Sequence, residues 1–201
     1  MALSEVREHR LLGIYLNDHL AAATAGLELF QRAARANART EIGPELARLC
    51  ADIEEDRTAL VVTMRALGIP RRQYKVALGW VGEKLGRLKL NGRFVSRSPL
   101  STLVEVETLR LGVEGKVLGW RVLRTLAAAD QRLDIGRIDD LISRAQRQIE
   151  VLDALHHQAA LSARLAGNEA LRALVDGRQA TRGGSASARS GARVPRPSSG
   201  S

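Results

Sequence analysis

The sequence contains a single cysteine, Cys50, and aromatic residues make up only 3% of its 201 residues. One cysteine excludes an internal disulfide framework and is typical of a reducing compartment, so we expect a cytoplasmic protein. With so few aromatic residues, a core must be built from Leu, Val, Ile and Ala. The sequence contains no stretch of about 18 apolar residues, so we expect no transmembrane helix. The N-terminus lacks the apolar segment of a signal peptide.

Proline is also scarce, and its positions indicate helix boundaries. Before residue 177 it occurs only at Pro44, Pro70 and Pro99. Alanine and leucine, both strong helix formers, are abundant between these positions. Apolar residues recur at alternating spacings of three and four, which is the pattern of a helix with one buried face. The sequence predicts four helices, over residues 4–36, 44–67, 98–128 and 138–165.

The connections between these helices predict their topology. The segments 37–43 and 129–136 are short, so each should join two antiparallel neighbours. The segment 71–98 is long, and its apolar residues recur at helical spacing. We therefore predict an all-α four-helix bundle made of two antiparallel hairpins joined by a long, partly helical crossover. The bundle domain should cover residues 1–176. Residues 177–201 are rich in Gly, Ser, Arg and Pro, so they predict a disordered basic tail.

The net charge of +9 is concentrated in the crossover and the tail. Residues 71–97 contain eight Lys or Arg against one acidic residue. Arg71, Arg72 and Lys75 are candidate phosphate-binding residues, which would allow non-specific binding of nucleic acid or of an anionic membrane surface. The alternative is that the basic residues form the solvated outer face of a crossover helix. No nucleic-acid-binding motif accompanies them.

Each predicted helix also places a polar residue on or beside its apolar face. These residues are His19, Asp56, Glu105 and His156, with Gln148 on the same face as His156. Folding each hairpin about its loop puts His19 near the level of Asp56, and Glu105 near the level of His156. An isolated buried charge is costly, so these groups should be paired, neutral or bound to a ligand.

In these features the chain resembles the ferritin-like superfamily, whose di-iron members hold metal with inward carboxylates and two Glu-x-x-His motifs. The resemblance covers about residues 4–166. Glu105 matches a carboxylate of that pattern, and Asp153-Ala154-Leu155-His156 resembles the carboxylate-x-x-His motif with a shorter acid. The second helix departs from the pattern because Ala59 occupies the histidine position after Asp56. The first helix has His19 where the family has glutamate.

Two interpretations of the polar residues are open. His19 with Asp56, and Glu105 with His156, could form hydrogen-bonded pairs that fix the register of the helices. Alternatively, the four side chains could form an altered metal site for Fe, Mn or Zn. The first interpretation predicts a structural or interaction protein, and the second a metal-binding protein or oxidoreductase. The sequence leaves open whether the chain forms a homo-oligomer.

Overall fold

The computed structural model describes residues 3–72 and 99–187, with side chains for residues 6–72 and 100–168. These residues form four helices and no strand, which confirms the all-α prediction. The helices are α1 (Leu3–Ala36), α2 (Gly43–Ala66), α4 (Pro99–Leu126) and α5 (Ile135–Ser187). Most of the predicted crossover, including Lys75, lies outside the described residues, as do residues 188–201. Among the described helices, none is both long and apolar enough to cross a membrane.

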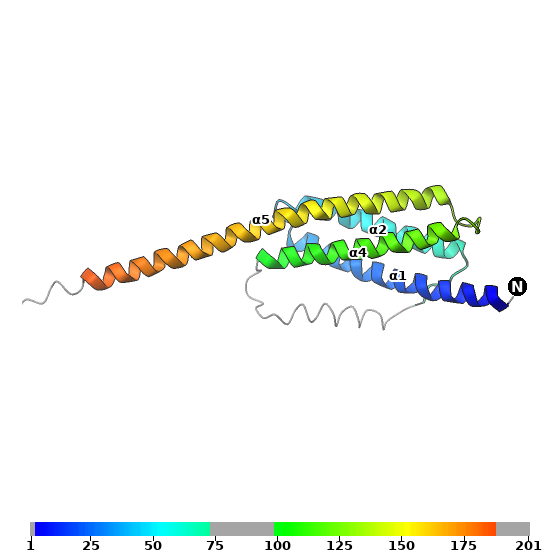
Figure 1. Ribbon diagram of the computed structural model, residues 1–201, viewed down its shortest axis with the longest axis horizontal. Helices are drawn as coiled ribbons and strands as arrows, with labels where there is room; N and C mark the ends of the chain where they lie inside the picture. The colour runs from blue at the N-terminus through cyan, green and yellow to red at the C-terminus, as the bar shows by residue number, and fades with distance from the viewer. Residues whose placement is uncertain (1–2, 73–98, 188–201) are drawn as a thin grey trace, which may run out of the picture. The chain divides into compact units, whose positions relative to one another are not determined.

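The helices form two antiparallel hairpins, as the short connections predict. Figure 1 shows α1 antiparallel to α2, and α4 antiparallel to α5. In the same view α2 and α4 run in the same direction. A simple up-down-up-down bundle would instead make the second and third helices antiparallel, so the order here requires a long connection between the hairpins.

The ends of α2 follow from its sequence. Gly68 has a φ of +70°, which glycine adopts without steric cost. Its N–H donates to the Arg65 carbonyl at 3.0 Å, and the N–H of Ile69 donates to the Met64 carbonyl at 2.9 Å. This pair of hydrogen bonds is a Schellman motif. The helix predicted over residues 44–67 therefore agrees with α2 to within one residue at each end.

Two buried asparagines hold the chain at the connection between α1 and α2 and at the segment that follows α2. Asn17, on α1, donates to the Pro70 carbonyl at 3.1 Å and accepts the N–H of Arg72 at 2.7 Å. Asn37, just after α1, donates to the Ala33 carbonyl at 2.9 Å. Both are only 2% exposed. The chain leaving α2 is thus held against α1 by a side chain that the sequence pattern did not single out.

The helix α5 is longer than expected. It begins after Asp134, whose carboxylate accepts the N–H of Arg137 at 3.1 Å and so caps the helix. It continues to Ser187 rather than ending near Leu165, so the predicted boundary at residue 176 lies within a helix. The chain divides into two units, residues 1–160 and 161–201. The bundle, including α5 up to Ala160, is the first unit, and the described part of the second unit is helical.

The core of the bundle consists of two apolar clusters. The first contains Ile53 of α2, Val113 and Val117 of α4, and Ala145 and Leu152 of α5. The second contains residues of the same three helices, about one turn from those of the first along each helix: Ala59, Leu60, Trp120 and Leu141. Asp56, Lys116, Arg144 and Gln148, called the polar cluster below, interrupt these apolar seams. Asp56 and Arg144 lie between the two clusters in sequence, whereas Lys116 and Gln148 lie between members of the first. Of the polar residues that the sequence predicts at the bundle centre, Asp56 and Gln148 are buried there.

Candidate functional site

The polar cluster is built around Asp56. This aspartate is 2% exposed, and it lies on the apolar face of α2 one turn after Ile53. Lys116 of α4 donates to Asp56 Oδ2 at a distance of 2.5 Å, and Arg144 of α5 donates to Asp56 Oδ1. Gln148 Nε2 lies 3.2 Å from Asp56 Oδ2. Side chains from two other helices, α4 and α5, therefore neutralise and hydrogen-bond one buried carboxylate of α2, which satisfies the requirement for burying a charge.

Two further contacts connect this cluster to its surroundings. Lys116 also donates to Gln148 Oε1, so lysine, glutamine and aspartate form a closed set of hydrogen bonds. Arg144 donates to Glu55 Oε2 at 2.8 Å on the outer side of α2. The side chain of Glu55 is 69% exposed. The partly exposed Arg144 therefore extends from the buried carboxylate of Asp56 to the surface carboxylate of Glu55.

The two basic groups respond differently to this environment. Burial lowers the pKa of Lys116 below its ordinary value, and the attraction of Asp56 only partly opposes this effect. Burial also acts against the charge of Arg144, but Asp56 and Glu55 outweigh it and raise the pKa of Arg144. The difference follows from exposure: the Lys116 side chain is 16% exposed and that of Arg144 is 27% exposed. Of the two groups, Lys116 is therefore the one in which burial outweighs the attraction of Asp56 and destabilises the charged form.

Lys116 should make the stability of the bundle depend on pH in the alkaline range. Its folded pKa lies below the ordinary value of 10.5, so between these two values the unfolded chain binds more protons than the folded protein. The free energy of unfolding should therefore rise as the pH increases through this window, and level off above 10.5. Urea unfolding at a series of pH values would give the difference in the free energy of unfolding between wild type and Lys116→Met, which isolates the contribution of Lys116. If this difference does not change with pH, or falls as the pH rises, the burial of a charged Lys116 is contradicted.

The structure places the other predicted site residues apart from this cluster. His19, on α1, packs against Gly119 of α4, where an added Cβ would lie 2.6 Å from its ring. His19 Nδ1 lies 3.1 Å from the Tyr15 carbonyl, and the rings of Tyr15 and His19 are 4.2 Å apart. The expected pair of His19 with Asp56 is thus replaced by ion pairs from Lys116 and Arg144.

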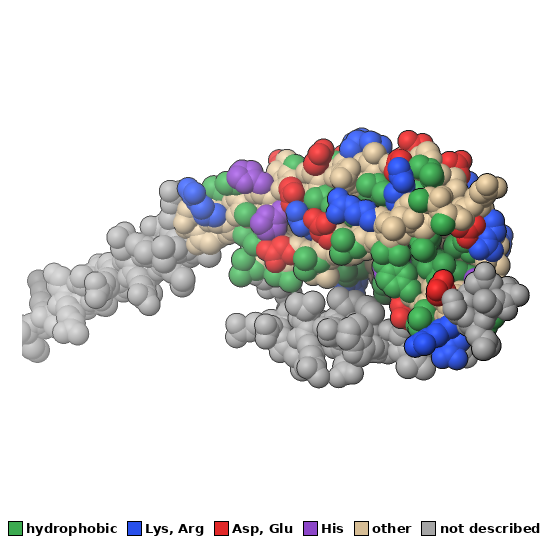
Figure 2. Space-filling model, turned by 45° about the vertical axis from the view of Figure 1, so that its right-hand side comes forward, with side chains coloured by type: hydrophobic (Ala, Val, Ile, Leu, Met, Phe, Trp, Pro, Cys, Tyr) green, Lys and Arg blue, Asp and Glu red, His purple; other side chains and the backbone are tan. Residues whose placement is uncertain are grey.

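His156 is at the surface, where its Nε2 lies 3.0 Å from Glu107 Oε1. Their side chains are 41% and 51% exposed. His156 therefore contacts Glu107 and not the expected partner Glu105, which lies two residues earlier on α4 and is partly buried. Figure 2 shows histidine side chains at the surface beside acidic ones. Asp153, the acid of the predicted carboxylate-x-x-His motif, instead pairs with Arg110 at 2.5 Å.

The predicted metal ligands do not assemble into a shared site. In the described part of the chain, no group of three or more His, Cys, Asp or Glu side chains is placed to hold a metal ion. Both carboxylate oxygens of Asp56 accept hydrogen bonds from basic side chains. The ammonium and guanidinium groups therefore occupy the positions that a metal ion would need. Binding of Fe, Mn or Zn by His19, Asp56, Glu105 and His156 stays a prediction that this arrangement does not support.

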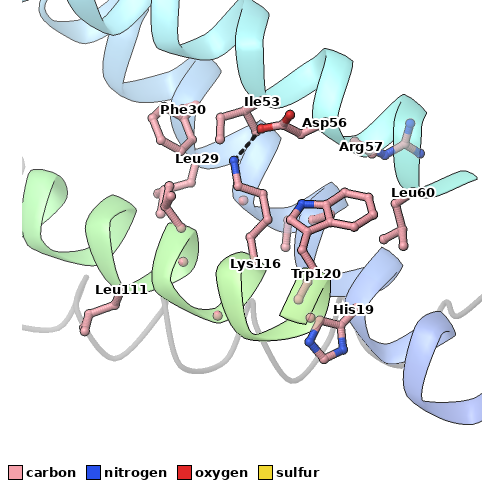
Figure 3. A pocket seen from close by; sticks show the side chains of 18 of the residues that line it. His19, Leu29, Phe30, Ile53, Asp56, Arg57, Leu60, Leu111, Lys116 and Trp120 are labelled. Carbon is pink, nitrogen blue, oxygen red and sulfur yellow. Dashed lines mark hydrogen bonds and ion pairs between the residues drawn. The ribbon is translucent and has the colours of Figure 1, made fainter. Parts of the chain in front are cut away.

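Beside the polar cluster lies a cavity of about 430 Å³ between α1, α2 and α4, called the apolar cavity below. Aliphatic and aromatic side chains such as Leu29, Phe30 and Trp120 form most of its wall. Lys116 and Asp56 reach it from one side, as Figure 3 shows, and His19 lines it on another. The cavity therefore combines an apolar wall with a few polar groups, as small-molecule sites do.

Sequence reasoning identified Asp56 and Gln148 but missed both basic partners. Lys116 gave a usable signal, because it fills the seam position between Val113 and Trp120 at spacings of three and four. A lysine at a core position opposite a buried aspartate suggests an ion pair. Arg144 gave a weaker signal, because it lies beside the seam of α5 and a long side chain can reach inward or outward from there.

Arg71 and Arg72 end the described segment after α2, and the backbone N–H of Arg72 is bound by Asn17. Their predicted role with Lys75 in phosphate binding stays a prediction. Comparison of the sequence with protein-family models and with curated proteins, and of the fold with solved structures, gave no match.

Proposed function

We propose that this chain is a helical-bundle interaction protein that associates with a second copy of itself through α4. The observation that carries the proposal is a row of exposed aliphatic side chains along that helix. They are Leu100, Val104, Leu111, Leu118 and Val122, called the α4 row below, and they are between 39% and 68% exposed. Their spacings of four and seven place them on one face of the helix. A row of exposed apolar side chains on one helix face is typical of a protein–protein contact.

The α4 row is symmetric about its central residue. Val104 and Leu118 are each seven residues from Leu111, and Leu100 and Val122 are each eleven residues from it. If two copies of α4 pack antiparallel, Leu111 meets its own counterpart, Val104 meets Leu118, and Leu100 meets Val122. A surface that matches itself in this way satisfies the requirement of a two-fold interface. At about 1.5 Å per residue, the matched face is about 33 Å long.

The polar cluster supports a structural rather than a chemical role for the bundle centre. Asp56 is held by Lys116, Arg144 and Gln148, so it has no oxygen free of a basic or amide partner. We also propose that the bundle is ferritin-like in topology, with the segment 71–98 as the crossover. The shared direction of α2 and α4 in Figure 1 supports this topology. Cytoplasmic location and binding of nucleic acid or anionic membrane stay predictions from the sequence.

Light scattering of the purified chain should give a dimer with twice the chain mass of 21.8 kDa. Leu111→Glu should shift it to monomer, because the two new carboxylates would face each other at the centre of the interface. Val62→Glu is the matched control, since Val62 of α2 is 41% exposed and lies outside the α4 row. Circular dichroism would show that both variants stay helical. A wild-type monomer, or a Leu111→Glu dimer, would refute the proposed interface.

Disulfide cross-linking tests the antiparallel register separately. In a Cys50→Ser background, Leu111→Cys should form a disulfide-linked dimer because the two cysteines meet at the two-fold axis. Leu118→Cys alone should cross-link poorly, because its expected neighbour is Val104 of the other copy. A mixture of Leu118→Cys and Val104→Cys proteins should restore the cross-link. Efficient cross-linking of Leu118→Cys by itself would indicate parallel packing and would exclude this register.

A further inference from the structure

The apolar cavity has the size and the wall of a small-molecule site. Its volume of about 430 Å³ falls within the usual range for such sites. On the sides formed by α1 and α4, its wall contains several residues with small side chains or none: Ala22, Ala23, Gly26, Gly112 and Gly115. An added Cβ at Gly26 or Gly112 would meet no atom within 4 Å. The two helices therefore leave room beside Leu29 and Phe30 that their own side chains do not fill.

Trp120 brings an unsatisfied donor to this cavity. Its side chain is 3% exposed, and its indole Nε1 has no hydrogen-bond partner among the described residues. A buried N–H without an acceptor is costly, and buried tryptophan usually finds a partner for it. In Figure 3 the nitrogen is on the edge of the indole ring nearer to Lys116. The cavity therefore offers a hydrogen-bond donor beside its charged group.

Lys116 supplies a second donor at the same wall. An ammonium group has three N–H donors, and the bonds to Asp56 and Gln148 use two of them. Lys116 and Arg144 share the carboxylate of Asp56, and Asp52 adds a weaker attraction on Lys116. Two N–H donors, one of them on an ammonium group, favour an anionic acceptor between Lys116 and Trp120, and a cation there is disfavoured.

We propose that the apolar cavity binds an aliphatic monocarboxylate. The hydrocarbon chain lies against the small residues of α1 and α4 and the side chains of Leu29 and Phe30. The carboxylate accepts the N–H of Trp120 and the third N–H of Lys116. The binding requires no reaction and no metal ion. Leu111 of the α4 row also lines the cavity, but the two proposed donors, Trp120 and Lys116, lie outside that row.

Titration of the full chain with decanoate tests this site directly. The sequence contains two tryptophans, so in a Trp80→Phe background all tryptophan emission comes from Trp120. We expect a saturable change in this emission with one decanoate bound per chain, and calorimetry should give the same affinity. Decanol should bind more weakly than decanoate, and decylamine more weakly than decanol, because the head group changes from anion to neutral to cation while the chain length is constant.

Two variants separate specific binding from general adhesion to an apolar surface. In the chain with Trp80 retained, calorimetry of Trp120→Phe should show decanoate binding weakened about tenfold or more, since a hydrogen bond to a charged group is lost while the ring is kept. Gly26→Leu should abolish binding by filling the cavity. Thermal unfolding would verify that both variants fold.

Three results would overturn the proposal. The first is the absence of saturable binding of decanoate to the wild-type chain, which would mean that only water occupies the cavity. The second is an equal affinity of Trp120→Phe and wild type together with binding to Gly26→Leu. The third is tighter binding of decylamine than of decanoate. Neither of the two variants changes a residue of the α4 row, so the dimer proposal is tested by separate proteins and can fail or hold separately.

Discussion

Replacing Asp56 with leucine should lower the free energy of unfolding by about 3–5 kcal/mol, measured by urea denaturation. The substitution removes the carboxylate to which both Lys116 and Arg144 donate hydrogen bonds. It also leaves Gln148, which is 2% exposed, without the acceptor for its amide N–H. Uncompensated buried charge is among the most destabilising changes that a single substitution produces. A loss below about 1 kcal/mol would show that water reaches the cluster and solvates it.

The matched control is Asp153→Leu. Asp153 also forms an ion pair with an arginine from another helix, Arg110, at 2.5 Å. Its side chain is 54% exposed, however, so its loss should cost at most about 1 kcal/mol. The contrast between the two aspartates would measure the effect of burial, because both changes remove one carboxylate and introduce the same side chain.

Removing the whole polar cluster should restore most of the lost stability. The variant Asp56→Leu, Lys116→Met, Arg144→Met, Gln148→Leu leaves no polar group of the cluster without its partner, and apolar replacements of buried ion pairs are often neutral or stabilising. Chelation distinguishes the structural role from the metal interpretation. If Asp56 held a metal ion, EDTA would lower the unfolding midpoint of the wild type and not that of the four-residue variant. We expect EDTA to change neither.

Gly43→Ala should destabilise the bundle by about 3 kcal/mol through overpacking. Gly43 is the first residue of α2, and an added Cβ would overlap the carbonyl oxygen of Asn37 and lie 3.2 Å from two backbone atoms of Ala38. These atoms belong to the chain between α1 and α2. They cannot move freely, because the same Asn37 carbonyl accepts hydrogen bonds from the N–H and the hydroxyl of Thr40, at 2.9 and 2.8 Å.

Gly112→Ala is the control for this change, since it adds the same methyl group to another helix. Gly112 lies within α4, and its Cβ would meet no atom within 4 Å. Alanine has a higher helix propensity than glycine, so this variant should gain about 0.5–1 kcal/mol. Urea denaturation of both variants would test the pair. Similar unfolding free energies for the two variants would show that the loop before α2 adjusts, and the close approach at Gly43 would then carry no constraint.

The helices could be predicted from the sequence because their signals are local. The seam of the second helix, Leu46, Leu49, Ile53, Asp56, Leu60 and Met64, is buried throughout, as its spacing predicts. Gly68 ends that helix by the mechanism that glycine allows. The predicted end of the last helix, at Leu165, was wrong by about 22 residues. None of residues 161–168 is buried, so the helix has already lost its buried face there and no change in the pattern marks its end.

The candidate site was predicted only in part. The sequence indicated a polar layer at the level of Asp56 and Gln148, since both interrupt an apolar seam. It did not show which residues would face them. His19 and Asp56 have matching depths, but depth along a hairpin does not fix rotation about each helix axis. The structure turns His19 toward Gly119 and brings Lys116 and Arg144 to the carboxylate instead.

The sequence by itself therefore determined the helical class, the hairpins and the presence of polar residues at the bundle centre. Helix propensity, apolar spacing and glycine or proline at the ends act over a few residues, so they can be read from one segment at a time. Only the tertiary structure decided the partners of Asp56, the exposed α4 row and the apolar cavity beside Trp120. Each of these depends on how helices far apart in sequence rotate and approach one another, which is set by the packing of the whole core.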